Sequence, residues 1–225
     1  MAIGCKIVKD FERATSEQIE MFRDFPVANI DDCMGRIAAI DADIVPIGKG
    51  KLLGPAFTVR VPQGDNLMFH AAMDMAKPGD VIIIDAGGFD NRAIFGELMA
   101  TYCKVRGIAG IVCSGAIRDS YAISQMENFP VYACGVTPNG PYKNGPGEIG
   151  VPVVIGGKTV YPGDIIVGDE DGVLAIRPED AEAVAKATQK IWDMESGIME
   201  HIVKDGTYIR PWVEEKLKAI GCEFV

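Results

Sequence analysis

The stretch VIIIDAGGFDNRAIFGELMATYCKVRGIAGIVCSGAIRD, residues 81–119, decides the fold that we expect. It begins with an unbroken apolar run at 81–85, which is typical of a buried strand. Residues 95–106 repeat apolar side chains at helical spacing, and Gly107 ends this predicted helix. Residues 108–115 form a second apolar run. The order strand, helix, strand predicts a mixed α/β layered domain.

The flanking sequence extends this pattern in both directions. On the N-terminal side we expect a helix from a Thr15 capping box to about Phe25, a helix at 30–40, a strand and turn within 51–66, and a helix at 66–77. On the C-terminal side we expect a helix at 119–128, a strand at 131–136, a long loop at 137–150, β-hairpins within 151–176, and a helix from 178 to about 204. A short tail follows.

Composition excludes several classes of protein. The net charge of −10 and the pI near 4.7 argue against a basic nucleic-acid-binding surface. Six cysteines without a CxxC pair and two distant histidines indicate neither a disulfide framework nor a His-rich zinc site. No signal peptide and no apolar run of membrane-spanning length is visible, so we expect a cytoplasmic protein without a membrane partner.

Gly96 is the first feature that suggests a ligand site. Free backbone N–H groups at a helix start, reinforced by the helix dipole, favour an anion. A glycine at this position also leaves room for a ligand to approach. Taken alone, glycines here more often just shape a strand-to-helix loop, as Gly87 and Gly88 would.

Arg118 and Asp119 stand side by side where the second strand ends. Because the carboxyl ends of neighbouring strands share one edge of such a sheet, we expect this pair to lie close to Gly96. Arg binds carboxylates through two parallel hydrogen bonds, and Asp is a hard oxygen ligand suited to Mg²⁺ or Mn²⁺. When Arg118 and Asp119 are considered by themselves, an equally good interpretation is that Asp119 caps the following helix. The convergence of all three features favours a catalytic site.

The same residues carry a resemblance to a known family. GELMA at 96–100, RGIAGIV at 106–112 and GAIRD at 115–119 closely resemble the RraA-like family. Its members include the 4-hydroxy-4-methyl-2-oxoglutarate (HMG) aldolases, often mislabelled as demethylmenaquinone methyltransferases. VANIDDCMGR at 27–36 and PGDIIVGDEDGVLAI at 162–176 resemble further family segments.

The resemblance implies a fold and an assembly. The fold would be a three-layer α/β/β sandwich of the swivelling-domain-like type, a single domain over 1–225. N-terminal helices would lie at about 15–40, and a C-terminal helix plus tail at about 179–225. The chain would form a homotrimer or hexamer with active sites between subunits.

The resemblance also implies a divalent-metal-dependent lyase that cleaves a 4-hydroxy-2-oxo acid to pyruvate and decarboxylates oxaloacetate. Backbone amides of Gly96, Glu97, Leu98 and Met99 would bind the carboxylate of this small 2-oxo acid. Arg118 would bind its carboxyl and keto end. Asp119 would hold the cation, with Mg²⁺ preferred and Mn²⁺ as the alternative.

Two further acids and a loop are less specific. Asp32 and Glu195 resemble family positions that carry acidic residues near the metal-bound waters. The ordinary interpretation is that Asp32 is a carboxylate at a helix end and that Glu195 is an exposed helix residue. The loop at 137–150 would either cover the site or be a surface excursion.

Two other functions compete with the lyase. One is a non-catalytic regulator of the kind that inhibits ribonuclease E by protein contact; the presence of Asp119 favours catalysis over it. The other is a methyltransferase, for which AGGFDN at 86–91 is a poor version of the glycine-rich loop required.

Overall fold

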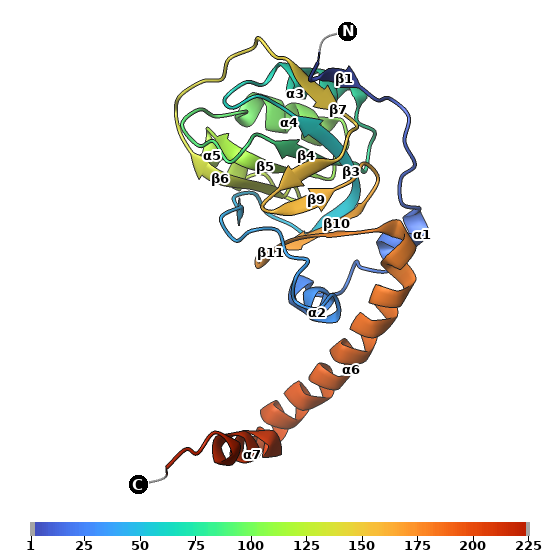
Figure 1. Cartoon of the computed structure of the whole chain (residues 1–225), viewed down its shortest axis with the longest axis vertical. Coiled ribbons are helices and arrows are strands. Elements are labelled where there is room, and N and C mark those ends of the chain that lie inside the picture. Colours follow the sequence, from blue (N-terminus) through green and yellow to red (C-terminus); the bar gives the residue numbers. More distant parts are fainter. Residues whose placement is uncertain (1–2, 224–225) are drawn as a thin grey trace. The chain divides into compact units, whose positions relative to one another are not determined.

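The computed structural model describes residues 3–223 and divides into two compact units. One unit ends at Thr188 and the other begins at Gln189. The first unit is a layered α/β structure with a large central sheet (Figure 1). The predicted α/β class and α/β/β layering are confirmed.

Four parallel strands form the centre of the sheet. They are β3 (Leu52–Arg60), β4 (Val81–Asp85), β5 (Gly110–Ile117) and β6 (Val131–Val136), in this spatial order. Three short strands complete the edges: β7 (Gly147–Ile149) and β1 (Cys5–Ile7) beyond β3, and β2 (Val45–Pro46) beside β6. The three short strands are not among the elements expected from the sequence.

Helices cover one face of this sheet. They are α3 (Leu67–Met75), α4 (Glu97–Val105) and α5 (Ser120–Ser124). A core cluster lies between them and the strands and contains Phe69, Ile82, Ile84 and Ile111. The helix expected at 119–128 is shorter than predicted because it ends at Ser124.

Hairpins cover the opposite face, as the sequence predicts. They are β8 (Val153–Ile155) with β9 (Lys158–Val160), and β10 (Ile165–Asp169) with β11 (Gly172–Ile176). Val81 and Ile83 face this layer, whereas Ile82 and Ile84 face the helices. Since successive strand side chains point to opposite faces, burial on both faces explains the unbroken apolar run of β4.

The outer face of the β10–β11 hairpin has its own helical cover. The helices are α1 (Ser16–Glu20) and α2 (Val27–Cys33), and the first residues of α6 (Ala181–Asp205) also take part. Phe22, Ile30, Ile165 and Leu174 belong to this third cluster. Both N-terminal helices end earlier than predicted; Gly35 and Arg36, which follow α2, adopt positive φ angles of 76° and 60°.

The second unit contains the later turns of α6 and a further helix, α7 (Pro211–Ala219). A 3₁₀ turn, Pro178–Asp180, precedes α6. The sequence predicts α6 closely but predicts only a tail in place of α7. In residues 3–223, no helix combines the length and apolarity that crossing a membrane requires.

Candidate active site

The end of β5 and the start of α4 lie side by side. The segment leading into α4 pairs with β5, because the N–H of Ile94 donates to the carbonyl of Ala116 at 2.8 Å. One step further, the N–H of Arg118 donates to the carbonyl of Phe95 at 2.9 Å. These backbone bonds bring Gly96 next to Arg118. The predicted convergence of the two segments is confirmed.

Asp119 points its carboxylate at α4, not at its own helix. It occupies the N-cap position of α5 with left-handed backbone angles, φ 56° and ψ 35°, and its side chain makes no capping hydrogen bond. Instead, its Oδ2 accepts the backbone N–H of Glu97 at 3.1 Å. Asp119 therefore stands at the N-cap position, as the capping interpretation expects, but its side chain does not cap the helix. Asp tolerates this backbone region better than most residues, and here the region directs the carboxylate toward the neighbouring helix.

Gly96 is needed for this approach. A Cβ at this position would lie 2.2 Å from Asp119 Oδ2 and 2.8 Å from Arg118 Cγ. The side chains of both residues therefore pass directly over the glycine. Arg118 lies beside the carboxylate, with its Nε 3.6 Å from Asp119 Oδ2.

These groups line a cavity of about 450 Å³, a size typical of small-molecule sites. Its lining contains every residue predicted for substrate and metal: Gly96, Glu97, Leu98, Met99, Arg118 and Asp119. The four amides differ in their availability, since that of Glu97 already donates to Asp119. The N–H groups of Leu98 and Met99 lie in the first turn of α4, where helices leave donors without intrahelical acceptors.

The loop at 137–146 forms another wall of the cavity. Gly140, Pro141 and Lys143 line it. Arg92 holds the loop, because it donates to the carbonyl of Gly140 at 2.9 Å and lies 4.1 Å from the centroid of the Tyr142 ring. This part of the loop therefore lines the cavity and is not a surface excursion away from it.

Asp65 anchors the same loop from beneath. This carboxylate is only 3% exposed and accepts the N–H groups of Asn144 at 2.6 Å and Gly145 at 3.0 Å. It also accepts the N–H of Leu67 at the start of α3, at 2.9 Å. One buried side chain thus joins the loop to the helix behind the cavity.

We expect Asp65→Ala to loosen this wall. Three backbone N–H groups in part-buried hydrogen bonds would lose their acceptor, so the free energy of unfolding should fall by about 3 kcal/mol. Hydrogen exchange should accelerate at Asn144 and Gly145 before global unfolding. Urea denaturation and exchange mass spectrometry measure the two effects, with Asp65→Asn, which keeps one acceptor oxygen, as an intermediate control. Unchanged exchange at both amides would contradict this role.

Asn66 and His70 complete the cavity from α3. Asn66 is 2% exposed and donates from its amide nitrogen to the carbonyl of Ile94 at 2.8 Å. Its Oδ1 is buried without a hydrogen-bond partner among the described residues. Burial, and secondarily the charge of Lys143, lowers the pKa of His70 below its ordinary value. Neither residue is predicted from the sequence, because their role depends on a loop some seventy residues away.

The cavity suits a hard cation with few protein ligands. Asp119 and Glu97 line it, and the Asp119 side chain is 45% exposed. Within residues 3–223, no three His, Cys, Asp or Glu side chains cluster as a metal cage. Mg²⁺ commonly binds through one or two carboxylates and keeps several waters. The residues present fit that coordination.

Asp32 and Glu195 lie elsewhere in the chain. Asp32 is on α2, and its Oδ1 accepts from Arg36 Nε at 2.5 Å. Glu195 is on α6 in the second unit, where it lines a groove with Trp192 and Met199. Neither lines the 450 Å³ cavity. Their predicted roles at the metal waters stay predictions.

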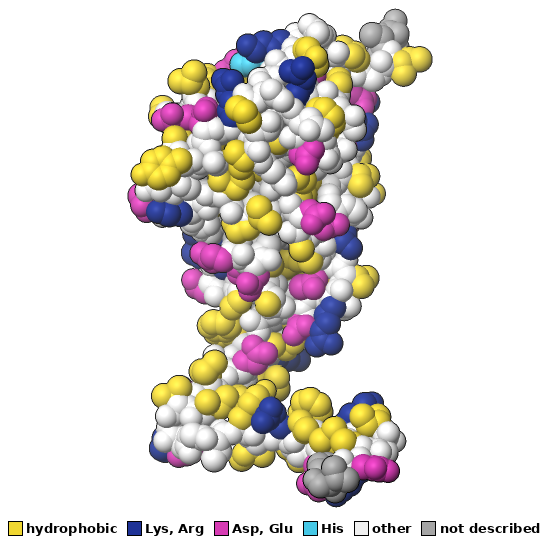
Figure 2. Space-filling view, turned by 90° about the vertical axis from the view of Figure 1, so that its left-hand side faces the viewer, with side chains coloured by type: hydrophobic (Ala, Val, Ile, Leu, Met, Phe, Trp, Pro, Cys, Tyr) yellow, Lys and Arg dark blue, Asp and Glu magenta, His cyan; other side chains and the backbone are white. Residues whose placement is uncertain are grey.

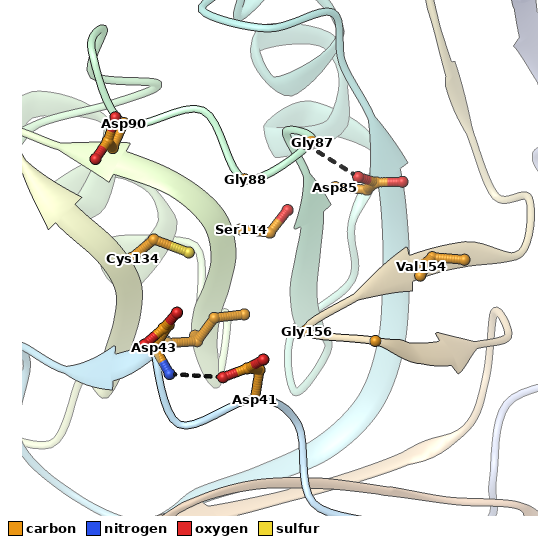
Figure 3. Close-up of a pocket in the computed structure, with 12 residues that line it drawn as sticks. Asp41, Asp43, Asp85, Gly87, Gly88, Asp90, Ser114, Cys134, Val154 and Gly156 are labelled. Atoms are coloured by element: carbon orange, nitrogen blue, oxygen red, sulfur yellow. Dashed lines mark hydrogen bonds between the residues drawn. The ribbon is translucent and has the colours of Figure 1, made fainter.

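A larger cavity, of about 590 Å³, lies beside the carboxyl ends of β4 to β6 and the turn of the β8–β9 hairpin (Figure 3). Four aspartates line it: Asp41, Asp43, Asp85 and Asp90. No Lys, Arg or His among the described residues lines this cavity. Burial raises the pKa of the Cys134 thiol, and the nearby aspartates raise it further. This negative field disfavours an anionic oxo acid.

Comparisons with known proteins agree with the geometry. A family profile described as "RraA-like: Aldolase/RraA" matches residues 27–175. The chain is 39% identical over 208 residues to a protein of Halalkalibacterium halodurans named "Putative 4-hydroxy-4-methyl-2-oxoglutarate aldolase". That alignment covers 91% of this chain and 98% of the relative.

Solved structures show the same fold. An uncharacterized protein from Pseudomonas syringae pv. tomato superposes with a TM-score of 0.75 at 24% identity, covering 88% of this chain and 98% of that one. The RNA-processing inhibitor RraA from Thermus thermophilus superposes with a TM-score of 0.62 at 28% identity, covering 67% and 92%. With the profile spanning the four central strands, the cavity lining and nearly all of both hairpins, the chain belongs to the RraA-like family.

Proposed function

We propose that this protein is a divalent-metal-dependent lyase that cleaves a 4-hydroxy-2-oxo acid and releases pyruvate. We propose that the same site decarboxylates oxaloacetate, that Mg²⁺ is the cofactor with Mn²⁺ as a substitute, and that the enzyme works in the cytoplasm. The name of the Halalkalibacterium relative, "Putative 4-hydroxy-4-methyl-2-oxoglutarate aldolase", supports the substrate class.

One observation carries the proposal. Arg118 and the carboxylate of Asp119 converge on the first turn of α4 inside a cavity of small-molecule size. A 2-oxo acid needs a partner for its carboxylate, a positive group at its keto oxygen and a cation ligand nearby. The amides of Leu98 and Met99 are suitable partners for the carboxylate. Arg118 is a positive group, and Asp119 is a suitable cation ligand.

The chain's own residues account for binding and orientation. In retro-aldol cleavage the 4-hydroxyl loses its proton, the C3–C4 bond breaks, and the electron pair moves to the keto oxygen. Arg118 would donate hydrogen bonds to that oxygen as its charge grows, which would stabilise the transition state more than the ground state. A bound divalent cation would add Lewis-acid stabilisation of the same charge. Decarboxylation of oxaloacetate develops the same enolate charge.

Exposed apolar side chains on α4 and α5 support an assembly. Leu98 and Val105 on α4 are 84% and 81% exposed, and Tyr121 on α5 is 80% exposed. Large apolar groups left exposed on neighbouring elements are typical of interfaces between subunits. We propose a homotrimer or hexamer with sites between subunits, in which Asp32 or Glu195 of a neighbouring copy supplies the acid near the metal waters.

The test is release of pyruvate from HMG and from oxaloacetate by purified protein, with Mg²⁺ and after chelation. We expect release that depends on the cation, and we expect Arg118→Ala to lower kcat/KM by about a hundredfold or more, as loss of a charge-stabilising donor does. Arg23→Ala, which removes an exposed arginine that pairs with Glu20 and does not line the cavity, is the control and should retain most activity. No release with either metal would overturn the proposal.

The competing role is a regulator of ribonuclease E type. The structural likeness to the Thermus RNA-processing inhibitor gives it a basis. It requires tight binding to a nuclease and no dependence on Asp119. Nuclease inhibition that survives Asp119→Asn, in a protein that releases no pyruvate, would favour it over the lyase.

A further inference from the structure

The cavity is electrically asymmetric. Glu97, Asp119 and Arg118 lie at the end where α4 begins, and Lys143 and His70 line it from the loop and from α3. Lys143 makes no hydrogen bond or ion pair with another described residue. Figure 2 shows a histidine and several Lys and Arg side chains gathered at one end of the larger unit.

The loop fixes where Lys143 stands relative to Arg118. Arg118 Nη1 lies 3.6 Å from the point where a Cβ of Gly140 would be. At the other end of the loop, a Cβ at Gly145 would lie 3.1 Å from Cδ2 of Leu67, which is on α3. Gly140 to Lys143 is three residues, which span at most about 10 Å. Arg118 lies near Gly140 and Lys143 follows three residues later, so the two basic residues line the same cavity.

The surroundings of Lys143 favour an anion with polar contacts. His70 faces the positive charge of Lys143 from the loop and the negative charge of Asp74 from its own helix. Asp74 in turn accepts a hydrogen bond from the Tyr102 hydroxyl at 2.6 Å. A neutral imidazole can still donate one N–H. The unpartnered Oδ1 of Asn66 on the same wall is an acceptor, so it suits a donor group of the ligand, such as a hydroxyl, and not the carboxylate.

We propose that Lys143, with His70, binds a second carboxylate of the substrate and selects oxo acids that carry one. The inference rests on the proposed function, since it concerns the far end of the same substrate. A charge-assisted hydrogen bond to Lys143 would be lost for any substrate ending in a methyl group. Such a bond is worth about tenfold or more in affinity.

Two unreactive ligands test this directly. 2-Oxoglutarate and 2-oxopentanoate have five carbons and the same 2-oxo carboxylate, and only the first has a distal carboxylate. Calorimetric titration with Mg²⁺ should give wild-type protein at least tenfold higher affinity for 2-oxoglutarate. Lys143→Met should reduce that ratio at least fivefold. Lys77→Met, two residues beyond the end of α3, removes an equal charge and should keep the wild-type ratio.

The outcomes separate this inference from the lyase proposal. Binding of both ligands with equal affinity, or a wild-type ratio in Lys143→Met, would overturn the selectivity inference and leave the lyase proposal standing. Failure to bind either ligand, together with no pyruvate release, would overturn both.

His70 gives a readout that a merely structural role of Lys143 would not produce. The chain has two histidines, so their ring signals are resolvable by NMR, and His201 in the second unit serves as the internal reference. Saturating 2-oxoglutarate should shift the His70 signals and raise its pKa, because a nearby anion favours the imidazolium. 2-Oxopentanoate should shift them less. Equal shifts with both ligands would count against a distal carboxylate at this position.

Discussion

Asp119→Asn is expected to lower kcat/KM for pyruvate release by about a thousandfold or more. Asparagine keeps the shape of the side chain and an oxygen that can accept the Glu97 N–H, so the local fold should be retained. It removes the negative charge that would hold the cation. Loss of about 4 kcal/mol of Lewis-acid stabilisation corresponds to roughly a thousandfold in rate.

Steady-state kinetics at several Mg²⁺ concentrations measure this effect, and thermal unfolding checks the fold. The matched control is Asp90→Asn, which neutralises an exposed carboxylate in the larger, acidic cavity and should leave kcat/KM within about threefold. An Asp119→Asn protein that keeps activity within tenfold of wild type, with the same Mg²⁺ dependence, would show that Asp119 is not the cation ligand.

Gly96→Ala is expected to lower kcat/KM by about a hundredfold with little loss of stability. The added Cβ would come within 2.2 Å of Asp119 Oδ2 and 2.8 Å of Arg118 Cγ, so both side chains must move. Displacing catalytic groups by about 1 Å can cost a hundredfold. Both side chains are nearly half exposed and can swing outward, and the φ of −145° at Gly96 suits alanine. The unfolding free energy should therefore change by less than about 1 kcal/mol.

Gly135→Ala on β6 is the control, because its Cβ would meet its nearest neighbour, the Cβ of Asp90, at an ordinary 3.6 Å. It should leave kcat/KM close to wild type. Full activity of Gly96→Ala would contradict a catalytic role for the close packing of Asp119 on the start of α4. A loss of activity that is accounted for by a matching loss of unfolding free energy would contradict it as well.

The sequence predicts the elements whose pattern is local. The apolar runs of β4 and β5 and the periodicity of α4 are each complete within a few residues, and all three elements occur as expected. The position of Arg118 and Asp119 beside Gly96 follows from parallel strands sharing an edge. A local pattern does not say where a side chain points. Only the structure shows that the carboxylate of Asp119 accepts a hydrogen bond from the backbone of α4.

The elements that the sequence does not predict depend on distant partners. β1 is three exposed residues that form a strand only by pairing with β7, over a hundred residues away. β7 in turn lies in a loop dense in Gly, Pro and Asn, where propensity argues against a strand. His70, on an apolar helix, carries no local signal of a binding role. The loop that carries Lys143 gives His70 that role once Asp65 fixes the loop in place.

The most direct test of the central claim, a cation held by Asp119 beside a bound oxo acid, is a crystal structure of the protein soaked with Mn²⁺ and pyruvate. Anomalous scattering locates Mn²⁺ without reference to any assumed ligand. We expect the peak at the carboxylate of Asp119, with pyruvate in the 450 Å³ cavity and its keto oxygen within hydrogen-bonding distance of Arg118. A peak among Asp41, Asp43, Asp85 and Asp90, with none at Asp119, would contradict the claim.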